Sequence, residues 1–534
     1  MKRKRIISIL SLILGSLLLL ACTKAGESQT GASESAEPSA AVEVPENGFT
    51  LGEPSETMPV PPEGMQPPEG MEPPEGWSGE GQPPQPPEGM GEPPQGGPGG
   101  QPPQGGPGGQ PPQGGPGGQP PQGGPGGPGG SAADVTYSAA TEITAAETQS
   151  GKTYESTAAN ENALLITTKE AVTLENPTVQ KTGNSDGGDA SNFYGLNAGI
   201  LCKDGANVTI TGGTIETSAS GANGVFSYGG NGGRNGAAGD GTTVTITGTV
   251  ITTTGSGSGG IMTTGGGTTY ANDLTITTSG QSSAPIRTDR GGGTVVVTGG
   301  TYTSNGLGSP TVYSTADITV KDATLVSNLS EGVVIEGKNV VRLTDCALSA
   351  NNTQRNSNAT FFDSIMLYQS MSGDADSGTS LFSMTGGSLK SMSGHVFHVT
   401  NTNAVIELSG VSITNEDPEN VLLSVCADGW SGAKNIATLR AKAQKLSGLI
   451  LVGSDSELTL SLTDGSIFTG AISGAITNAK GETVSSEVGT VHVSIDATST
   501  WTLTADTYVT SFTGDASRIV TNGFSLYVNG VKLV

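Results

Sequence analysis

The chain has 534 residues and a formal net charge of −25 at pH 7, with 84 glycines and 31 prolines that are concentrated early in the sequence. Nucleic acids and anionic membrane surfaces attract clustered lysine and arginine side chains, so this acidic balance argues against either as a partner. The length allows several domains, but the composition divides the chain into an early low-complexity part and a later part rich in β-branched residues.

Residues 1–21 are predicted to be an export signal. The basic stretch Lys2–Arg5 precedes the apolar run Ile6–Leu20, which is shorter than the ~20 residues of a membrane span. The run ends in Leu-Leu-Ala-Cys, which resembles a bacterial lipobox and implies lipidation of Cys22. Several acyl chains on one residue anchor a protein stably, so we expect a lipid-anchored protein on the extracellular side of the cell membrane. The alternative is an ordinary secreted protein with a chance cysteine.

Residues 22–130 are predicted to be the lipidated N-terminus followed by a disordered linker. Pro-Pro-Glu-Gly-Met repeats over residues 61–90 give way to Gln-Pro-Pro-Gln-Gly-Gly-Pro-Gly-Gly repeats that run through Gly127. Glycine does not occupy every third position, which excludes collagen. Such a composition buries too little apolar surface to offset the entropy of ordering. The segment reads as a tether that holds a later domain away from the membrane.

Residues 131–534 are predicted to form one domain built from a repeat. The phrase Val-Thr-Ile-Thr-Gly-Gly-Thr-Ile begins at Val208, and many successive copies start 21 to 24 residues apart. A period of this length indicates a solenoid, a propeller or another array. The clearer copies are Val244–Ile251, Leu274–Gln281, Val295–Tyr302, Ile318–Leu325, Val341–Leu348 and Phe382–Leu389.

Each repeat predicts three short strands. Apolar residues at alternate positions, as in Val208 and Ile210, are typical of a strand with one buried face. Glycine or aspartate then allows a bend, a second strand carries one inward apolar residue, and a third strand follows a polar turn. No segment has helical periodicity, and the patterns of leucine-rich repeats and propellers are missing. We therefore expect an all-β parallel β-helix with three strands in each coil.

These coils resemble the right-handed parallel β-helices of the pectate-lyase-like class. More closely, the runs beginning at Asn223, Gly259, Ile286 and Glu331 are similar to uncharacterised, adhesin-like bacterial surface lipoproteins. The resemblance covers roughly residue 160 to the C-terminus. It implies a right-handed solenoid at the cell surface, and it implies little about activity because fold does not determine function.

The C-terminal residues and the cysteines have mainly structural interpretations. The segment from Trp501 to the end is denser in aromatic residues and lies outside the earlier register, so it is predicted to form the last coils and a cap. Apart from Cys22, the chain has Cys202, Cys346 and Cys426, an odd number without framework spacing. These three are expected to be buried free thiols.

The sequence has no clear catalytic or metal-binding motif, and we predict no cofactor and no catalytic residue. It has only three histidines and one dense charge cluster in the coils, Arg287-Thr-Asp289-Arg290. Such a cluster at a turn is more often structural than catalytic. Two oxygen-rich loops, 184–189 and 374–378, are of the kind that Ca²⁺ accepts, although Asx-Gly loops usually make turns.

The third strand gives the strongest functional signal. One position of each coil is always aliphatic and is therefore expected to face inward, from Ile200 to Val396. The next position must face outward because strand side chains alternate, and it is often apolar or aromatic. Such a stripe indicates an interaction surface, unless a loop such as 351–363 covers it. The candidate binding residues are Phe226, Tyr228, Met262, Arg287, Asp289, Tyr313, Met366, Tyr368 and Phe397.

These features favour a membrane-tethered, extracellular binding protein. Its expected partner is a polysaccharide or another cell-surface component. An enzyme of the lyase or hydrolase type and a surface spacer without a ligand remain the two alternatives. A cleft with clustered acidic and basic residues would favour the enzyme, an open aromatic stripe the binding protein, and a uniformly polar surface the spacer.

Overall fold

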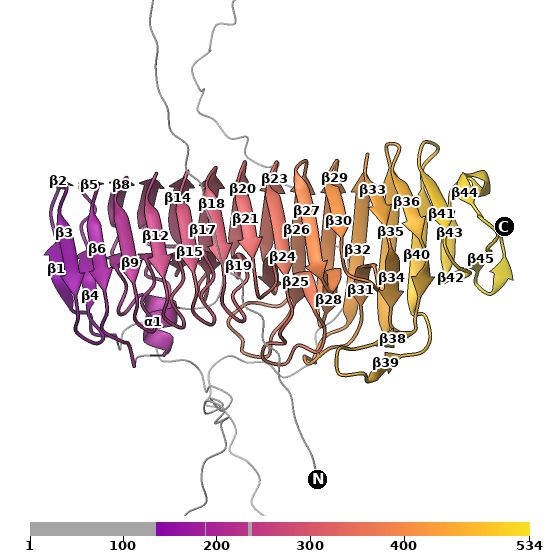
Figure 1. Cartoon of the computed structure of the whole chain (residues 1–534), viewed down its shortest axis with the longest axis horizontal. Coiled ribbons are helices and arrows are strands. Elements are labelled where there is room, and N and C mark those ends of the chain that lie inside the picture. The colour runs from indigo at the N-terminus through magenta and orange to yellow at the C-terminus, as the bar shows by residue number, and fades with distance from the viewer. Residues whose placement is uncertain (1–134, 187, 233–237) are drawn as a thin grey trace, which may run out of the picture. The chain divides into compact units, whose positions relative to one another are not determined.

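The computed structural model describes residues 135–186, 188–232 and 238–534. The predicted signal peptide, Cys22 and the predicted linker lie outside these residues. The described part is almost entirely β-structure, with one short helix, α1 (Asp189–Tyr194), and one turn of 3-10 helix (Ala516–Arg518). Successive coils stack in parallel along one axis (Figure 1). The prediction of an all-β, right-handed parallel β-helix with three strands per coil is confirmed.

Three long parallel sheets form the sides of the solenoid, and every third strand in the chain belongs to the same sheet. Sheet A has 13 strands: β1 (Ala139–Ile143), β4 (Asn162–Ile166), β7 (Ile200–Cys202), β10 (Val225–Tyr228), β13 (Ile261–Thr264), β16 (Ile286–Thr288), β19 (Val312–Ser314), β22 (Val333–Glu336), β25 (Asp363–Tyr368), β28 (His395–Thr400), β31 (Val421–Val425), β34 (Leu449–Val452) and β37 (Ile472–Ser473).

Sheet B has 14 strands: β2 (Glu147–Ser150), β5 (Ala171–Glu175), β8 (Asn207–Thr211), β11 (Thr243–Thr247), β14 (Gly267–Asn272), β17 (Gly293–Thr298), β20 (Asp317–Lys321), β23 (Val340–Thr344), β26 (Thr379–Thr385), β29 (Asn403–Ser409), β32 (Asn435–Lys442), β35 (Ser456–Thr463), β40 (Thr490–Ile495) and β43 (Ser511–Thr513). Sheet C has ten: β3 (Thr153–Ser156), β6 (Thr178–Lys181), β9 (Thr214–Thr217), β12 (Val250–Thr253), β15 (Thr275–Thr278), β18 (Thr301–Ser304), β21 (Thr324–Ser327), β24 (Ala347–Asn351), β27 (Ser388–Ser393) and β30 (Ser412–Asn415).

The last coils depart from this regularity. A four-stranded sheet D follows sheet C and consists of β33 (Lys445–Ser447), β36 (Ile467–Gly470), β41 (Thr500–Leu503) and β44 (Ile519–Val520). Two small sheets contain antiparallel pairs, namely β38 (Ile476–Thr477) with β39 (Thr483–Ser485), and β42 (Thr507–Val509), β45 (Leu526–Val528) and β46 (Val531–Lys532). Trp501 is fully buried in these coils and stacks on Phe468 at 5.5 Å between ring centroids.

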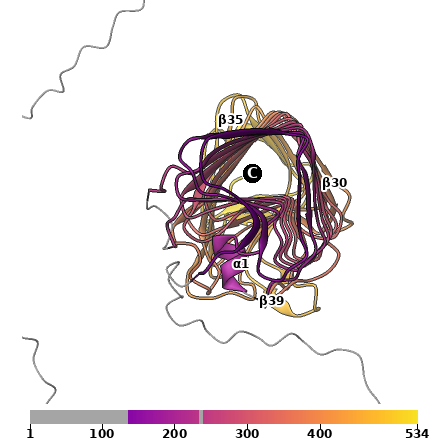
Figure 2. The same cartoon turned by 90° about the vertical axis from the view of Figure 1, so that its left-hand side faces the viewer.

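The end-on view shows that the stacked coils enclose a common interior (Figure 2). The buried residues of the main core fill this interior along the solenoid. In β8, Val208 and Ile210 are fully buried and alternate with exposed residues. They pair with Val244 and Ile246 of the next coil, so the same face of each strand is inward. Burial of each such side chain is worth about 1.5–3 kcal/mol, and the repeat of this pattern makes the register of the coils specific.

One coil was placed incorrectly by the repeat pattern. The segment Leu274–Gln281 was expected to begin a coil, but it contains the second strand, β15. The first strand of that coil is β14, in which Thr269 and Ala271 pair with Val244 and Ile246. Because a threonine and an alanine take the two inward positions, this strand lacks the apolar alternation by which the other copies are recognised.

The corner between sheets B and C has the same backbone geometry in most coils. A residue with positive φ ends the first strand, and glycine, asparagine or aspartate takes that place in most coils, as at Gly212, Asp273 and Asp345. These residue types adopt the left-handed conformation most readily. Ala443 occupies the same corner with φ 48°. The expectation that Gly or Asp allows the bend is confirmed at these corners.

The three cysteines of the described part are free and buried, as expected. Cys202 lies in the main core. Within the described residues, no helix is both long and apolar enough to cross a membrane.

Candidate functional site

The outward row of sheet A exists, and its register is the predicted one over seven coils. Neighbouring strands place the following residues side by side: Leu201, Phe226, Met262, Arg287, Tyr313, Val334 and Met366. The environment changes along the row, because two separate segments of the chain pack onto it. Its members therefore fall into a covered group and a group around a cleft.

The first part of the row is covered by the helix α1. Phe226, Tyr228 and Met262 are at most 3% exposed and pack with Phe193 and Tyr194 of the helix. The rings of Tyr194 and Tyr228 meet edge to face at 5.7 Å between centroids. This first part of the row is therefore covered, as the alternative to an open interaction surface expected. The covering segment is the insertion that contains α1 and not the segment 351–363. These three candidates form a second, smaller core outside sheet A.

Phe397 does not face outward, and the prediction of its orientation is wrong. It pairs with the inward Ile365, is fully buried, and packs against Phe382 of the main core at 5.8 Å between ring centroids. The error is a one-residue slip within His-Val-Phe-His-Val, where two adjacent apolar residues fit the inward position equally well. The outward residue of this coil is His398, which pairs with Met366.

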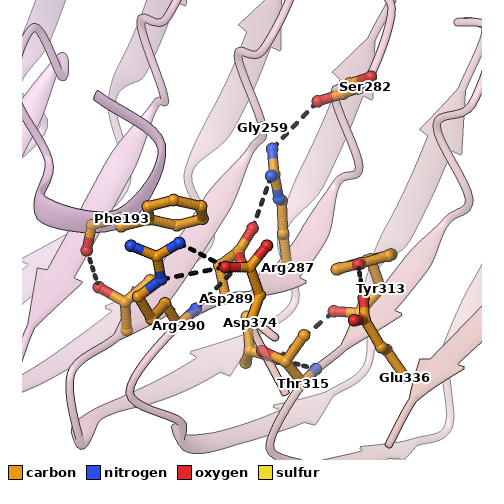
Figure 3. A network of polar contacts seen from close by, with 12 residues as sticks. Phe193, Gly259, Ser282, Arg287, Asp289, Arg290, Tyr313, Thr315, Glu336 and Asp374 are labelled. Atoms are coloured by element: carbon orange, nitrogen blue, oxygen red, sulfur yellow. Dashed lines mark hydrogen bonds and ion pairs between the residues drawn. The ribbon is translucent and has the colours of Figure 1, made fainter. Parts of the chain in front are cut away.

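The charge cluster in the middle of the row is internally paired (Figure 3). Arg287 donates to Asp289 Oδ2 at 2.7 Å and to the carbonyl of Ser282 at 3.1 Å. Arg290 donates through Nε and Nη2 to Asp374 Oδ1, at 3.0 and 2.5 Å. Burial raises the pKa of Asp289, and the Arg287 guanidinium opposes this shift. All four charges have a partner, which supports the structural interpretation of this cluster.

Arg290 also ties the helix cover to the solenoid. Its guanidinium carbon lies 4.1 Å from the ring centroid of Phe193 in α1 (Figure 3). A cation over an aromatic face is attracted by the ring quadrupole and contributes about 0.5–2 kcal/mol. The contact closes the covered part of the row on the side of the cluster.

A cleft of about 480 Å³ lies beyond the cluster, over β19, β22 and β25. The apolar part of its lining is formed by Tyr313, Val334, Met366, Tyr368 and Trp430. The rings of Tyr368 and Trp430 meet at 4.9 Å and 62°. The polar part of the lining includes Glu331, Glu336, Asn356, Ser370, Ser372 and Asp374. Three of the nine predicted binding residues, Tyr313, Met366 and Tyr368, therefore surround one cleft.

Glu336 organises the polar side of this cleft. Its Oε2 accepts hydrogen bonds from the hydroxyls of Tyr313, at 2.5 Å, and Tyr368, at 3.1 Å, and its Oε1 accepts one from Ser370. The side chain is 1% exposed, and burial raises the pKa of its carboxyl, which these hydroxyl donors oppose. The neighbouring charge of Asp289 raises this pKa as well. The carboxyl thus holds two aromatic rings in fixed orientations.

The two loops considered for calcium use their carboxylates in other contacts. Asp374 binds Arg290, and Asp376 forms an ion pair of 2.9 Å with Lys338. Asp186 accepts a hydrogen bond of 2.5 Å from Asn160. Across the ranges that the structure describes, no group of three or more His, Cys, Asp or Glu side chains is arranged to hold a metal ion.

Sequence reasoning missed Trp430 as a site residue. It comes from the loop after β31 and packs on Tyr368, which lies 62 positions earlier in the chain. One signal was available, because a lone tryptophan in the short run Asp-Gly-Trp-Ser-Gly has no core to join within its own segment. Aromatic residues in such loops are common contributors to binding sites.

Comparisons with protein families, with curated proteins and with solved structures found no match to this chain. The chemistry of the cleft is therefore the basis on which a function can be proposed. Its aromatic walls are suited to an apolar face of a ligand, and its carbonyl, hydroxyl and carboxyl oxygens are suited to hydrogen-bond donors.

Proposed function

We propose that this protein is a lipid-anchored, extracellular β-helix that binds a polysaccharide, or another hydroxylated component of a cell surface, in the cleft above β19, β22 and β25. The observation that carries the proposal is the presence of Tyr313, Tyr368 and Trp430 around one cleft with a buried carboxyl at its base. An adhesin-like role follows if the ligand belongs to another cell.

The chemistry of the lining favours a sugar. An aromatic ring presents a flat apolar face, and sugar rings offer matching C–H surfaces together with hydroxyls at their edges. Burial of one aromatic side chain is worth about 1.5–3 kcal/mol. The coils repeat at roughly 4.8 Å, close to the length of one sugar unit, so an extended glycan can follow sheet A.

The charges of the lining favour an uncharged glycan. Glu331 and Glu336 are 7% and 1% exposed, and Asp374 lines the same cleft. The cation closest to Asp374 is Arg290, which is already engaged by that carboxylate. A polyanionic ligand would add negative charge to this surface, and the described residues that line the cleft include no lysine or arginine to receive it.

A glycan array probed with the full chain and with a Trp430→Ala variant tests the binding function. We expect binding to neutral glycans, and we expect the variant to lose at least about tenfold in affinity, the equivalent of about 1.4 kcal/mol. The matched control is Tyr508→Ala, which removes an aromatic ring that is 48% exposed and distant in the sequence from the cleft. Equal binding by all three proteins would overturn the cleft as the site, and absence of any binding would favour the spacer.

The membrane anchor is tested separately through Cys22. If its thiol carries the lipid, Cys22→Ala releases the protein from the membrane fraction or leaves the precursor unprocessed. The measurement is fractionation with an immunoblot, and the length of the product distinguishes the two results. An alanine variant that is still processed and membrane-bound contradicts the lipobox interpretation.

A second candidate function, cleavage of a polysaccharide, is favoured by one observation. Glu336 is a buried carboxyl with a raised pKa in a cleft, and the carboxyl of Asp289 is close enough to shift it. A carboxyl whose pKa is raised by burial is suited to act as the general acid in the cleavage of a glycosidic bond. Release of reducing ends or unsaturated products from a bound glycan, with loss of release in Glu336→Gln, would establish it, and a bound but intact glycan would exclude it.

A further inference from the structure

A second cavity lies on the outer side of sheet A, further along the chain than the cleft. It has a volume of about 370 Å³, and its lining includes Phe361, His395, Asp417, Glu419 and Asn478. The ring of Phe361 packs against that of His395 at 5.4 Å between centroids. The cavity shares no lining residue with the cleft of the proposed function.

Behind His395, a continuous row of buried polar side chains leads away from this cavity. His395 Nδ1 lies 2.7 Å from Ser424 Oγ, and the same Oγ lies 2.8 Å from His398 Nδ1. His398 Nε2 lies 3.4 Å from Asp428 Oδ2. Ser424 and His398 are fully buried, and the side chain of Asp428 is 1% exposed. The strands β28 and β31 bring them together, since His398 and Ser424 are partners in the parallel register.

The state of Asp428 fixes the far end of this row. Its Oδ1 accepts hydrogen bonds from the backbone N–H and the hydroxyl of Thr360, at 2.8 and 2.6 Å, and from the N–H of Gly429 at 2.7 Å. Burial raises the pKa of Asp428, but His398 and these donors outweigh it and hold the pKa below its usual value. Asp428 is therefore a carboxylate at neutral pH, and its Oδ2 carries no hydrogen.

The carboxylate fixes the tautomer of each group in turn. His398 Nε2 and Asp428 Oδ2 lie 3.4 Å apart, and neither of these buried atoms forms a hydrogen bond within the described part of the chain. A lone pair on Nε2 would be repelled by the carboxylate at this distance, so Nε2 carries the hydrogen. Neutral imidazole has one donor and one acceptor nitrogen, and hence His398 Nδ1 accepts from the hydroxyl of Ser424. The Ser424 oxygen then accepts from Nδ1–H of His395. Nε2 of His395 is left with a lone pair.

His395 lines the cavity, and because its Nδ1 contacts Ser424, Nε2 is the ring nitrogen left for a ligand there. His395 is 6% exposed, and no described residue forms a hydrogen bond with its Nε2. The acidic groups around the ring are Asp417 and Asp428, which act on it electrostatically, and Asp363 of β25, which is its partner in the sheet register. Burial raises the pKa of Asp363 and favours its uncharged form. His398 is the other titratable group that faces it.

We infer that His395 is the proton-accepting base of this cavity, and that Ser424 and His398 connect it to Asp428 as a proton relay. A proton from a ligand hydroxyl or ammonium group binds Nε2 of His395. The Nδ1 proton of His395 moves to Ser424 as the hydroxyl proton of Ser424 moves to Nδ1 of His398. One proton enters, none leaves, and the positive charge rests on His398 beside Asp428. The cavity accordingly takes ligands that offer a hydrogen-bond donor.

The alternative location of the charge, on His395 itself, is unfavourable. Burial, together with the neighbouring His398, lowers the pKa of His395 to about 3. An imidazolium at that position has lost hydration without gaining a carboxylate in contact. The relay moves the charge to the one imidazole that has a carboxylate in contact, at His398.

The test uses the full chain with ¹⁵N-labelled histidines, at neutral pH, and reads the tautomer of each ring by long-range ¹⁵N–¹H spectra. Only three rings contribute, and His395→Gln and His398→Gln assign them. We expect Nδ1–H for His395 and Nε2–H for His398. Nε2–H on His395 in the wild type would overturn the inference.

Asp428→Asn is the decisive variant, because it should reverse the direction of every hydrogen bond between His398, Ser424 and His395. The asparagine Oδ1 keeps the three donors from Thr360 and Gly429, which turns its NH₂ group toward His398 Nε2. His398 then becomes Nδ1–H, Ser424 donates to His395, and His395 switches to Nε2–H. His395 retaining Nδ1–H in a folded Asp428→Asn protein would show that the groups are not connected.

Ser424→Ala provides the second line of evidence and does not depend on folding of the first variant. Loss of the hydroxyl removes the acceptor for His395 Nδ1–H, so His395 should revert to the more common Nε2–H form while His398 keeps Nε2–H. His492 bonds to Ser511 on sheet B at 2.7 Å and serves as the internal control, with an unchanged signal in both variants. Unaltered spectra for His395 in Ser424→Ala would overturn the relay.

Discussion

The hydroxyl of Tyr313 donates a 2.5 Å hydrogen bond to Glu336, which belongs to the next coil of the solenoid. Tyr368, one coil further on, donates to the same carboxyl oxygen at 3.1 Å. One carboxyl therefore links three successive strands of sheet A through their outward side chains. The two rings are held in place before any ligand arrives, which reduces the entropy lost on binding.

Tyr313→Phe separates the structural from the binding contribution of this residue. The variant removes one donor from a buried carboxyl, and we expect the free energy of unfolding to fall by about 1–3 kcal/mol. The ring remains, so affinity for a glycan bound through the cleft should change by less than the tenfold expected for Trp430→Ala. Urea unfolding measures the first quantity. Tyr508→Phe is the control and should have wild-type stability, and a Tyr313→Phe protein as stable as the control would contradict the role of the hydroxyl.

Asp363→Asn should stabilise the protein at neutral pH. Asp363 is 1% exposed, its Oδ1 has no hydrogen-bond partner among the described residues, and burial raises the pKa of its carboxyl well above 3.8. As pH rises past its usual pKa, the unfolded chain releases this proton while the folded chain keeps it. Stability from this group is therefore full below that pH and is lost as pH rises toward the folded pKa.

We expect the difference in stability between Asp363→Asn and the wild type to grow from about pH 4 to pH 8, up to about 1–3 kcal/mol. Asp496→Asn is a control of opposite sign. The N–H of Asp464 donates to Asp496 and lowers the pKa of its carboxyl, so its contribution is present above the usual pKa and is lost as pH falls. Parallel pH profiles for the wild type and Asp363→Asn would show that this carboxyl is not held protonated.

The solenoid itself was predictable because its core depends on local alternation. The apolar side chains of Val208 and Ile210 alone identify the inward face of their strand, and the paired residues of the next coil show the same pattern. The prediction failed where two registers were equally good, at Val396 and Phe397, and where small residues occupied the core, at Thr269 and Ala271. In both cases packing with the neighbouring coils decides what the local pattern leaves open.

The surface was less predictable because it is built by insertions. The outward row on sheet A could be predicted because side chains alternate along a strand. The sequence around Phe226 and Met262 does not indicate that α1 packs over them. The approach of Trp430 to Tyr368 likewise depends on the path of a loop. The contacts of His395 with Ser424 depended on the corrected register of β28, because a slip of one residue places His398 on the wrong face.

The inward face can be tested with two adjacent residues of β21. Leu325 is fully buried in the main core, whereas the next residue, Val326, is only partly buried and faces outward. Leu325→Asp places an unpaired charge in the core and should abolish cooperative folding. The cost of burying such a charge is comparable to the whole free energy of unfolding of a domain, which is about 5–15 kcal/mol. Val326→Asp should remain folded, with a loss of about 1 kcal/mol or less. Circular dichroism melts of both variants measure this, and equal melting temperatures would refute the assigned faces.

Ala443→Gly should stabilise the solenoid, because Ala443 is an exposed non-glycine residue with φ 48° at a corner where other coils use glycine, asparagine or aspartate. The left-handed conformation costs an alanine about 1–2 kcal/mol, whereas glycine adopts it freely and loses about 0.5–1 kcal/mol more backbone entropy on folding. We expect a net gain of up to about 1 kcal/mol in the free energy of unfolding, measured by urea denaturation.

The matched control is Ala441→Gly, two residues earlier in β32, where the side chain is 1% exposed and faces the core. That variant removes a buried methyl group from a strand without relieving any strain, and it should lose about 1–2 kcal/mol. Loss of stability in both variants would mean that the corner at Ala443 carries no strain, and that the positive φ is accommodated there by the hydrogen bond from its N–H to Thr463.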